Sequence, residues 1–118
     1  MDFVSFEIAK KLKEKGYGES WDYVYNDDGV ICIPCYNLTE EDTIPMCPAP
    51  QIHEVLKWLR EEKKIHISIM LFMFQEGWCY EVVRLGENPT LITTQRSSTN
   101  TYEQAAIAGI EYVLDNLI

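Results

Sequence analysis

The chain has 118 residues, of which 47% are hydrophobic and 25% are charged, and its formal net charge is −9. This size and composition predict one globular domain, 1–118, whose core needs neither a disulfide nor a metal ion to fold. The acidic balance argues against nucleic acid as a direct partner, because phosphate binding depends on clustered Lys and Arg side chains.

The N-terminal segment and the apolar runs indicate a cytoplasmic protein. The start, MDFVSFEIAKKLKEKG, lacks the apolar region and the cleavage site of a signal peptide. The longest apolar run, 67–74, is interrupted by Ser68 and is too short to span a bilayer. In such a compartment the four cysteines are expected to be reduced thiols; they are Cys32, Cys35, Cys47 and Cys79.

The first third of the chain predicts a helix followed by a β-hairpin. Ser5 is the expected N-cap of a helix over 6–14. Alternating aromatic residues in 21–25 and the apolar run 30–33 predict two strands, which Asp28-Gly29 would join in a tight turn. No periodicity follows in 36–49, which predicts a long irregular connection of the kind that often carries function.

The rest of the chain predicts a helix, three strands and a second helix. The helix after Pro50 has one apolar face, formed by Ile52, Val55, Leu56 and Leu59, with Trp58 flanking it. Period-two alternation predicts a strand over 65–74, and further strands are expected over 78–85 and 90–95. Asn100 and Glu103 resemble a capping box at the start of a last helix that ends near Asn116.

These elements predict an α+β fold of order α-β-β-α-β-β-β-α. An antiparallel meander of about three strands, together with the N-terminal hairpin, would carry its helices mainly on one face. The outer side of the strand over 65–74 ends in the apolar residues Met70, Phe72 and Phe74. Either the N-terminal helix and hairpin cover this end, or a second copy does so in a homodimer.

Cys32-Ile33-Pro34-Cys35 forms a C-x-x-C pair that raises the possibility of a metal site. Cys47 and His53 are the residues that would complete a zinc ligand set, but the spacing is not that of a zinc finger or ribbon. A redox role would need a helix N-terminus beside a thiol, and Pro34 after a strand does not provide one. Buried or half-buried free thiols are the competing interpretation.

Residues 21–42 combine aromatic and acidic side chains, which suits protein recognition or imitation of the charge of DNA. The aromatic candidates are Trp21, Tyr23, Tyr25 and Tyr36, and the acidic candidates are Glu40, Glu41 and Asp42. The competing interpretations are that Trp21 and Tyr25 form the inner face of the hairpin and that the acidic run is a solvated loop.

The segment PAPQIHEVLKWLREEKKIHISI resembles a family of small uncharacterised proteins from Bacteroidales gut bacteria and their phages or mobile elements. The opening FVSFEIAKKLKEKGY and the closing TYEQAAIAGIEYVLDNLI are similar to the same family, so the resemblance covers nearly the whole chain. It implies a phage-related soluble protein and carries no catalytic residue over to this sequence.

The order α-β-β-β-α of residues 50–118 also resembles the double-stranded RNA-binding domain. That family grips phosphates with basic residues at the start of its last helix, where this chain has Thr101, Tyr102, Glu103 and Gln104. The resemblance therefore implies a shared topology without RNA binding.

Together these features predict a non-catalytic protein-binding or accessory module that uses residues 21–49 as its contact surface, without a cofactor. Two alternatives stay open. One is a metal-binding or enzymatic protein with a site at Cys32, Cys35, Cys47 and His53. The other is an acidic DNA mimic that inhibits a host protein.

Overall fold

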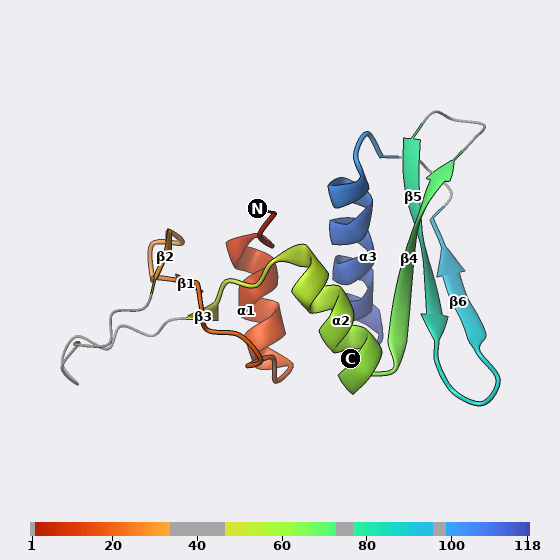
Figure 1. The fold of residues 1–118 in the computed structure, drawn as a ribbon, viewed down its shortest axis with the longest axis horizontal. Coiled ribbons are helices and arrows are strands. Elements are labelled where there is room, and N and C mark those ends of the chain that lie inside the picture. The colour runs from red at the N-terminus through yellow and green to blue at the C-terminus, as the bar shows by residue number, and fades with distance from the viewer. Residues whose placement is uncertain (1, 34–46, 73–76, 96–98) are drawn as a thin grey trace. The chain divides into compact units, whose positions relative to one another are not determined.

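A computed structural model describes residues 2–33, 47–72, 77–95 and 99–118 (Figure 1). The chain divides into two compact units, Met1–Gln51 and Ile52–Ile118. The boundary lies close to residue 50, where the sequence places the start of its second group of elements. We call these parts unit 1 and unit 2; the single domain over 1–118 stays a prediction.

Unit 1 begins with helix α1 (Phe6–Glu14), whose expected cap and bounds are confirmed. The Ser5 hydroxyl accepts a hydrogen bond from the Ile8 amide at 3.3 Å, which satisfies one of the free donors of the first turn. Gly16 has a φ of 95°, the left-handed conformation that commonly ends a helix. The buried face of α1 consists of Ile8, Ala9 and Leu12.

The small sheet of unit 1 has the strand order β2-β1-β3 and is antiparallel. The predicted hairpin is confirmed by β1 (Val24–Tyr25) and β2 (Ile31–Cys32), although both strands are shorter than expected. Strand β3 (Cys47–Pro48) pairs with β1 inside the segment for which we predicted no regular structure. Two residues that include a proline give no periodic signal, so only the pairing partner reveals this strand. The preceding part of that segment, 36–46, lies outside the described residues.

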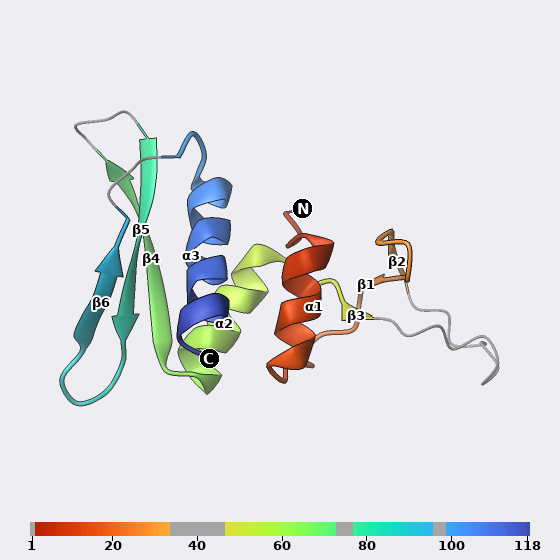
Figure 2. The same cartoon turned by 180° about the vertical axis from the view of Figure 1, so that it is seen from behind.

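Unit 2 contains the predicted meander between two helices, which confirms the α+β class. Its elements are α2 (Ile52–Glu62), β4 (Ile65–Phe72), β5 (Gly77–Arg84), β6 (Thr90–Thr94) and α3 (Tyr102–Asn116). The antiparallel sheet has the order β4-β5-β6, and its register shifts between Val82 and Val83. Figures 1 and 2 show α2 and α3 on the same face of this sheet. Residues 73–74, at the end of the predicted first strand, lie outside the described residues.

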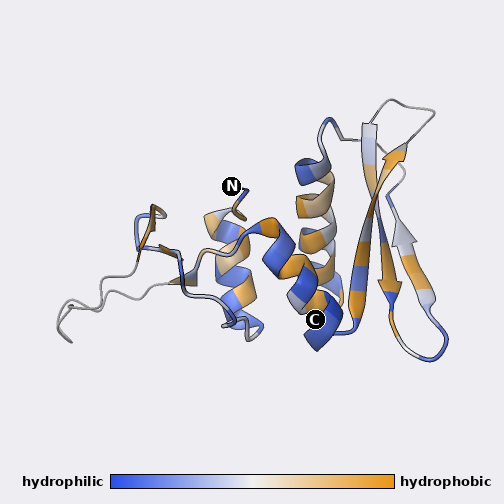
Figure 3. Cartoon of the chain, in the orientation of Figure 1, coloured by the Kyte–Doolittle hydropathy of each residue, from blue (hydrophilic) through white to orange (hydrophobic). Residues whose placement is uncertain are grey.

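The core of unit 2 forms where the two helices meet the sheet. Helix α2 buries Ile52, Val55, Trp58 and Leu59. The prediction placed Leu56 on this face and Trp58 beside it, but Trp58 is buried and Leu56 is only half-buried. The Lys63 ammonium lies 5.3 Å from the centre of the Trp58 ring. The middle of α3 is largely hydrophobic, whereas α1 and α2 carry both hydrophobic and hydrophilic residues (Figure 3).

Two local features position α3. Its N-cap is Thr101 rather than the expected Asn100: the Thr101 hydroxyl accepts from the Gln104 amide at 3.1 Å, and Gln104 Oε1 accepts from the Asn100 amide. Gly109 meets the sheet so closely that an added Cβ would lie 2.8 Å from Ile67 Cγ2. Among the described residues, no helix is long and apolar enough to cross a membrane.

Candidate functional site

The turn between β1 and β2 is held by one side chain. Asn26 Oδ1 accepts hydrogen bonds from the amides of Asp28 at 2.9 Å and Val30 at 3.0 Å. The Asn26 carbonyl accepts from the Gly29 amide at 3.0 Å, and the Asn26 amide donates to the Val30 carbonyl at 3.0 Å. Asn side chains are well suited to such turns because they hydrogen-bond to the backbone that follows them. The backbone of the turn is thus fixed from Asn26 to Val30.

Helix α1 anchors this turn through Phe6. Gly29 has a φ of 77°, which an L side chain rarely adopts, and a Cβ at this position would lie 2.9 Å from Phe6 Cδ2. The Phe6 ring also contacts Tyr25, with 5.3 Å between ring centres, and the Lys10 ammonium lies 4.5 Å from the Phe6 ring centre. The turn is therefore packed against the helix at its glycine.

Three large apolar side chains of the hairpin and of the residues on either side of it are exposed. Trp21 is 47% exposed, Val30 57% and Ile33 72%. The carboxylates of the same stretch are exposed as well, and positions 21–33 contain no Lys or Arg. We call this set the hairpin surface; it consists of Trp21, Asp22, Asp27, Asp28, Val30 and Ile33.

The aromatic residues predicted as contacts divide between the surface and the core. Trp21 is exposed, but Tyr25 is 6% exposed and its hydroxyl donates to the Val4 carbonyl, which makes it a core residue of unit 1. Tyr23 is half-buried and makes an edge contact with Phe3, with 5.1 Å between ring centres. The inner-face interpretation therefore applies to Tyr25 and does not apply to Trp21. Four further candidates lie outside the described residues; they are Tyr36, Glu40, Glu41 and Asp42.

The register of the small sheet separates two of the predicted metal ligands. Cys32 lies opposite Val24 on β1, whereas Cys47 lies opposite Tyr25. Directly opposed residues share a face and consecutive residues alternate, so Cys32 and Cys47 point to opposite faces. Burial raises the pKa of the Cys47 thiol, an effect that Lys13 and Lys10 only partly oppose, and this disfavours the thiolate that binds metals.

The remaining metal candidates add no ligand cluster. His53 is an exposed residue of α2 in unit 2, and Cys35 lies outside the described residues. Among the residues that the structure describes, no group of three or more His, Cys, Asp or Glu side chains is placed to hold a metal ion. The described residues therefore offer no support for the alternative of a cysteine-histidine metal site.

Val30 and Ile33 are the apolar residues of the hairpin surface that the sequence did not single out as contacts, and Asp22, Asp27 and Asp28 are its acidic residues that were not among the predicted contacts. An apolar run after a turn predicts a buried strand, but β2 covers only Ile31 and Cys32, and both are half-buried. Two features of the sequence could have indicated that these residues are exposed. The apolar run is short, and the proline that follows it confines the strand to an edge of the sheet.

No protein-family model, curated protein or solved structure matches the chain. The resemblance to proteins of Bacteroidales bacteria and their phages thus remains an expectation from the sequence.

Proposed function

We propose that the protein is a non-catalytic protein-binding module whose contact site is the hairpin surface. The observation that carries the proposal is the exposure of Trp21, Val30 and Ile33 beside three exposed carboxylates. Isolated exposed apolar residues are ordinary, but a tryptophan and two aliphatic residues are exposed here within 13 positions of the sequence, and protein interfaces bury such mixtures of apolar and acidic side chains. Trp is also among the residues that contribute most to binding when a partner desolvates it.

The charge of the hairpin surface defines the partner. Asp22, Asp27 and Asp28 lie in a stretch of sequence without any basic residue, and Lys10 of α1, which lies over the Phe6 ring, forms an ion pair with Glu7 at 3.1 Å. A partner surface of Lys and Arg around an apolar patch would therefore be complementary. Exposed apolar side chains favour protein recognition over imitation of DNA, whose phosphate backbone offers charge without such groups. The fixed turn reduces the ordering cost of binding, because Asn26 and Phe6 already hold its backbone.

The proposal is tested by quantitative recovery of partners on immobilised variants. Val30→Ser in unit 1 and Leu91→Ser in unit 2 form a matched pair, because both side chains are 57% exposed. We expect Val30→Ser to lose most of the bound partner and Leu91→Ser to retain it. Neutralising Asp27 and Asp28 as Asn should weaken recovery mainly at low salt, since exposed charges are screened as ionic strength rises. Equal recovery on Val30→Ser, Leu91→Ser and the unmodified chain would refute the proposal.

A further inference from the structure

Strand β4 forms one edge of the sheet of unit 2, and its pairing pattern shows which backbone groups point away from the sheet. The Leu85 amide donates to the Lys64 carbonyl at 2.8 Å, which makes this a hydrogen-bonded pair. Such pairs alternate along an antiparallel ladder, so Ile65, Ile67, Ile69 and Leu71 direct their N–H and C=O groups away from β5. No backbone hydrogen bond from the described part of the chain reaches these groups.

Strand β4 lacks the sequence features by which proteins usually prevent pairing at a sheet edge. Strand β4 is eight residues long, contains no proline, Lys, Arg, Asp or Glu, and runs in unbroken register with β5. The opposite edge differs, because β6 has five residues and its pairing with β5 is interrupted at Val82/Val83. A long, regular and uncharged edge offers a template for another strand. Of the two edges, β4 is thus the one suited to pairing.

We propose that this edge pairs with the same strand of a second copy, antiparallel about a twofold axis at Ser68. In this register, all four residues whose N–H and C=O groups point away from β5 are paired: Ile65 lies opposite Leu71 of the other copy, and Ile67 lies opposite Ile69. No other twofold register pairs all four. On the helix-bearing side, every pair is then apolar, and Leu71, which is 60% exposed, gains an apolar neighbour. A foreign strand would have to reproduce this pattern, which a second copy provides by symmetry.

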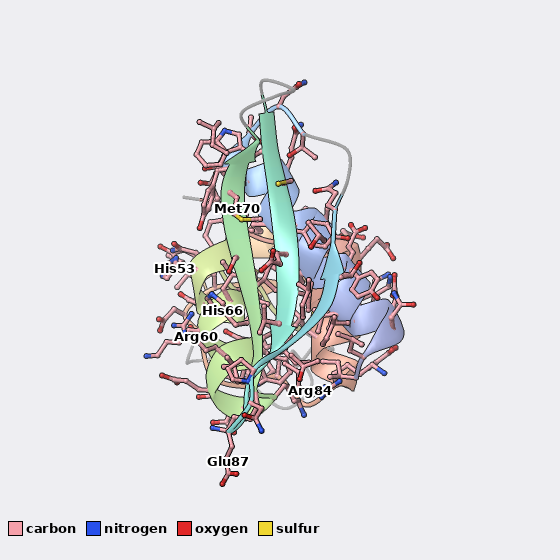
Figure 4. The ribbon with its side chains drawn as sticks, turned by 90° about the vertical axis from the view of Figure 1, so that its right-hand side faces the viewer. His53, Arg60, His66, Met70, Arg84 and Glu87 are labelled. Carbon is pink, nitrogen blue, oxygen red and sulfur yellow. The ribbon has the colours of Figure 1, made fainter. Side chains whose placement is uncertain are left out.

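The other side of the sheet is compatible with this register. Figure 4 shows His66 and Met70 on the open face, with α2 behind the strands. In the proposed pairing, His66 lies opposite Met70 of the second copy, and Ser68 lies opposite Ser68. Strand β4 carries no Lys, Arg, Asp or Glu, so pairing two copies of this strand brings no like charges together between the strands, although the chain has a net charge of −9. The two sheets would continue as one sheet of six strands.

The position of Ser68 on the axis gives a direct test. Ser68→Lys places two ammonium groups opposite each other across the axis. The matched control is Thr94→Lys. Glu81 on β5 pairs with Ser68 on β4 and with Thr94 on β6, so both positions have the same cross-strand neighbour. In sedimentation equilibrium the unmodified chain and Thr94→Lys should reach twice the 13.7 kDa of the chain, and Ser68→Lys should raise the dissociation constant about tenfold or more.

A cysteine at the same position tests the register. Residues that face each other in a non-hydrogen-bonded pair have Cα atoms about 4.5 Å apart, within the range that a disulfide spans. Ser68→Cys should therefore form an intermolecular disulfide under mild oxidation, whereas Thr94→Cys and the unmodified chain should not. A monomer at every concentration, equal dimerisation of the two lysine variants, or equal cross-linking of the two cysteine variants would each overturn the proposal. Unchanged circular dichroism of the variants shows that the monomers remain folded.

Discussion

Replacing Gly109 by Ala tests how closely α3 packs on its sheet. An exposed Gly-to-Ala change within a helix stabilises by about 1 kcal/mol through backbone propensity. Here the new Cβ would lie 2.8 Å from Ile67 Cγ2 and 3.2 Å from Tyr80 Cγ, well inside the 3.5–4.0 Å of favourable carbon contacts. Overpacking of this kind costs about 1–3 kcal/mol. The difference between these two terms is a net loss of about 0–2 kcal/mol. Because the Ile67 methyl is the branch of a buried strand residue and cannot move aside, we expect the upper half of this range, about 1–2 kcal/mol.

Urea unfolding followed by circular dichroism measures this loss as a lower midpoint with an unchanged slope. Gly86→Ala is the control, because no atom lies within 4 Å of a Cβ at that turn and its φ is not in the left-handed region. Ile67→Ala should be costly alone but less costly in the Gly109→Ala background, since the truncated side chain makes room for the new methyl. If Gly109→Ala were as stable as the unmodified chain or more stable, the close approach of α3 to β4 would be wrong.

Two further predictions concern a strained residue and a buried hydroxyl. Lys64 has a φ of 57°, so Lys64→Gly should relieve left-handed strain and stabilise by about 0.5–1 kcal/mol, whereas Lys64→Ala should leave the urea midpoint nearly unchanged. Equal effects of the two substitutions would contradict the strain. Burial, and to a smaller extent Cys47, raises the pKa of Tyr25, so the folded chain keeps this proton to higher pH than the unfolded chain does. That contribution is complete below the unfolded pKa and is lost as pH rises through the folded pKa. Tyr25→Phe should therefore reduce the loss of stability at alkaline pH. It should also cost about 1 kcal/mol of stability at neutral pH, because the hydrogen bond to the Val4 carbonyl is removed. The same loss of stability at alkaline pH in Tyr25→Phe and in the unmodified chain would refute the role of the Tyr25 proton.

The fold was predictable where side chains repeat at the period of a helix or strand. The bounds of α1 and the meander of unit 2 follow from such repeats, and the Ser5 cap follows from hydrogen-bond chemistry that lies within one turn. Strand β3 could not be predicted, because Cys47 and Pro48 gain strand geometry only from pairing with β1. The cap of α3 was misplaced by one residue, since Asn100 and Thr101 both suit an N-cap.

The candidate site was predictable only in part, for a physical reason. Trp21 and Tyr25 have similar sequence surroundings, yet one is exposed and the other is buried with its hydroxyl bonded to Val4. Sequence alternation distinguishes the two faces of a strand but does not show which face another element will cover. The exposure of Val30 likewise depends on the turn that Asn26 holds.

The most direct test of the central claim is site-specific photo-crosslinking from the hairpin surface inside cells. A photoreactive amino acid with an apolar side chain, which keeps the apolar character that Val30→Ser removes, replaces Val30 in one variant and Leu91 in another, two positions with the same 57% exposure. The proposed binding role predicts a discrete covalent adduct with a basic protein from position 30, and the Asp27→Asn, Asp28→Asn background should weaken it. It predicts no such adduct from position 91. The same adducts from both positions, or none from position 30, would contradict a contact site on the hairpin surface.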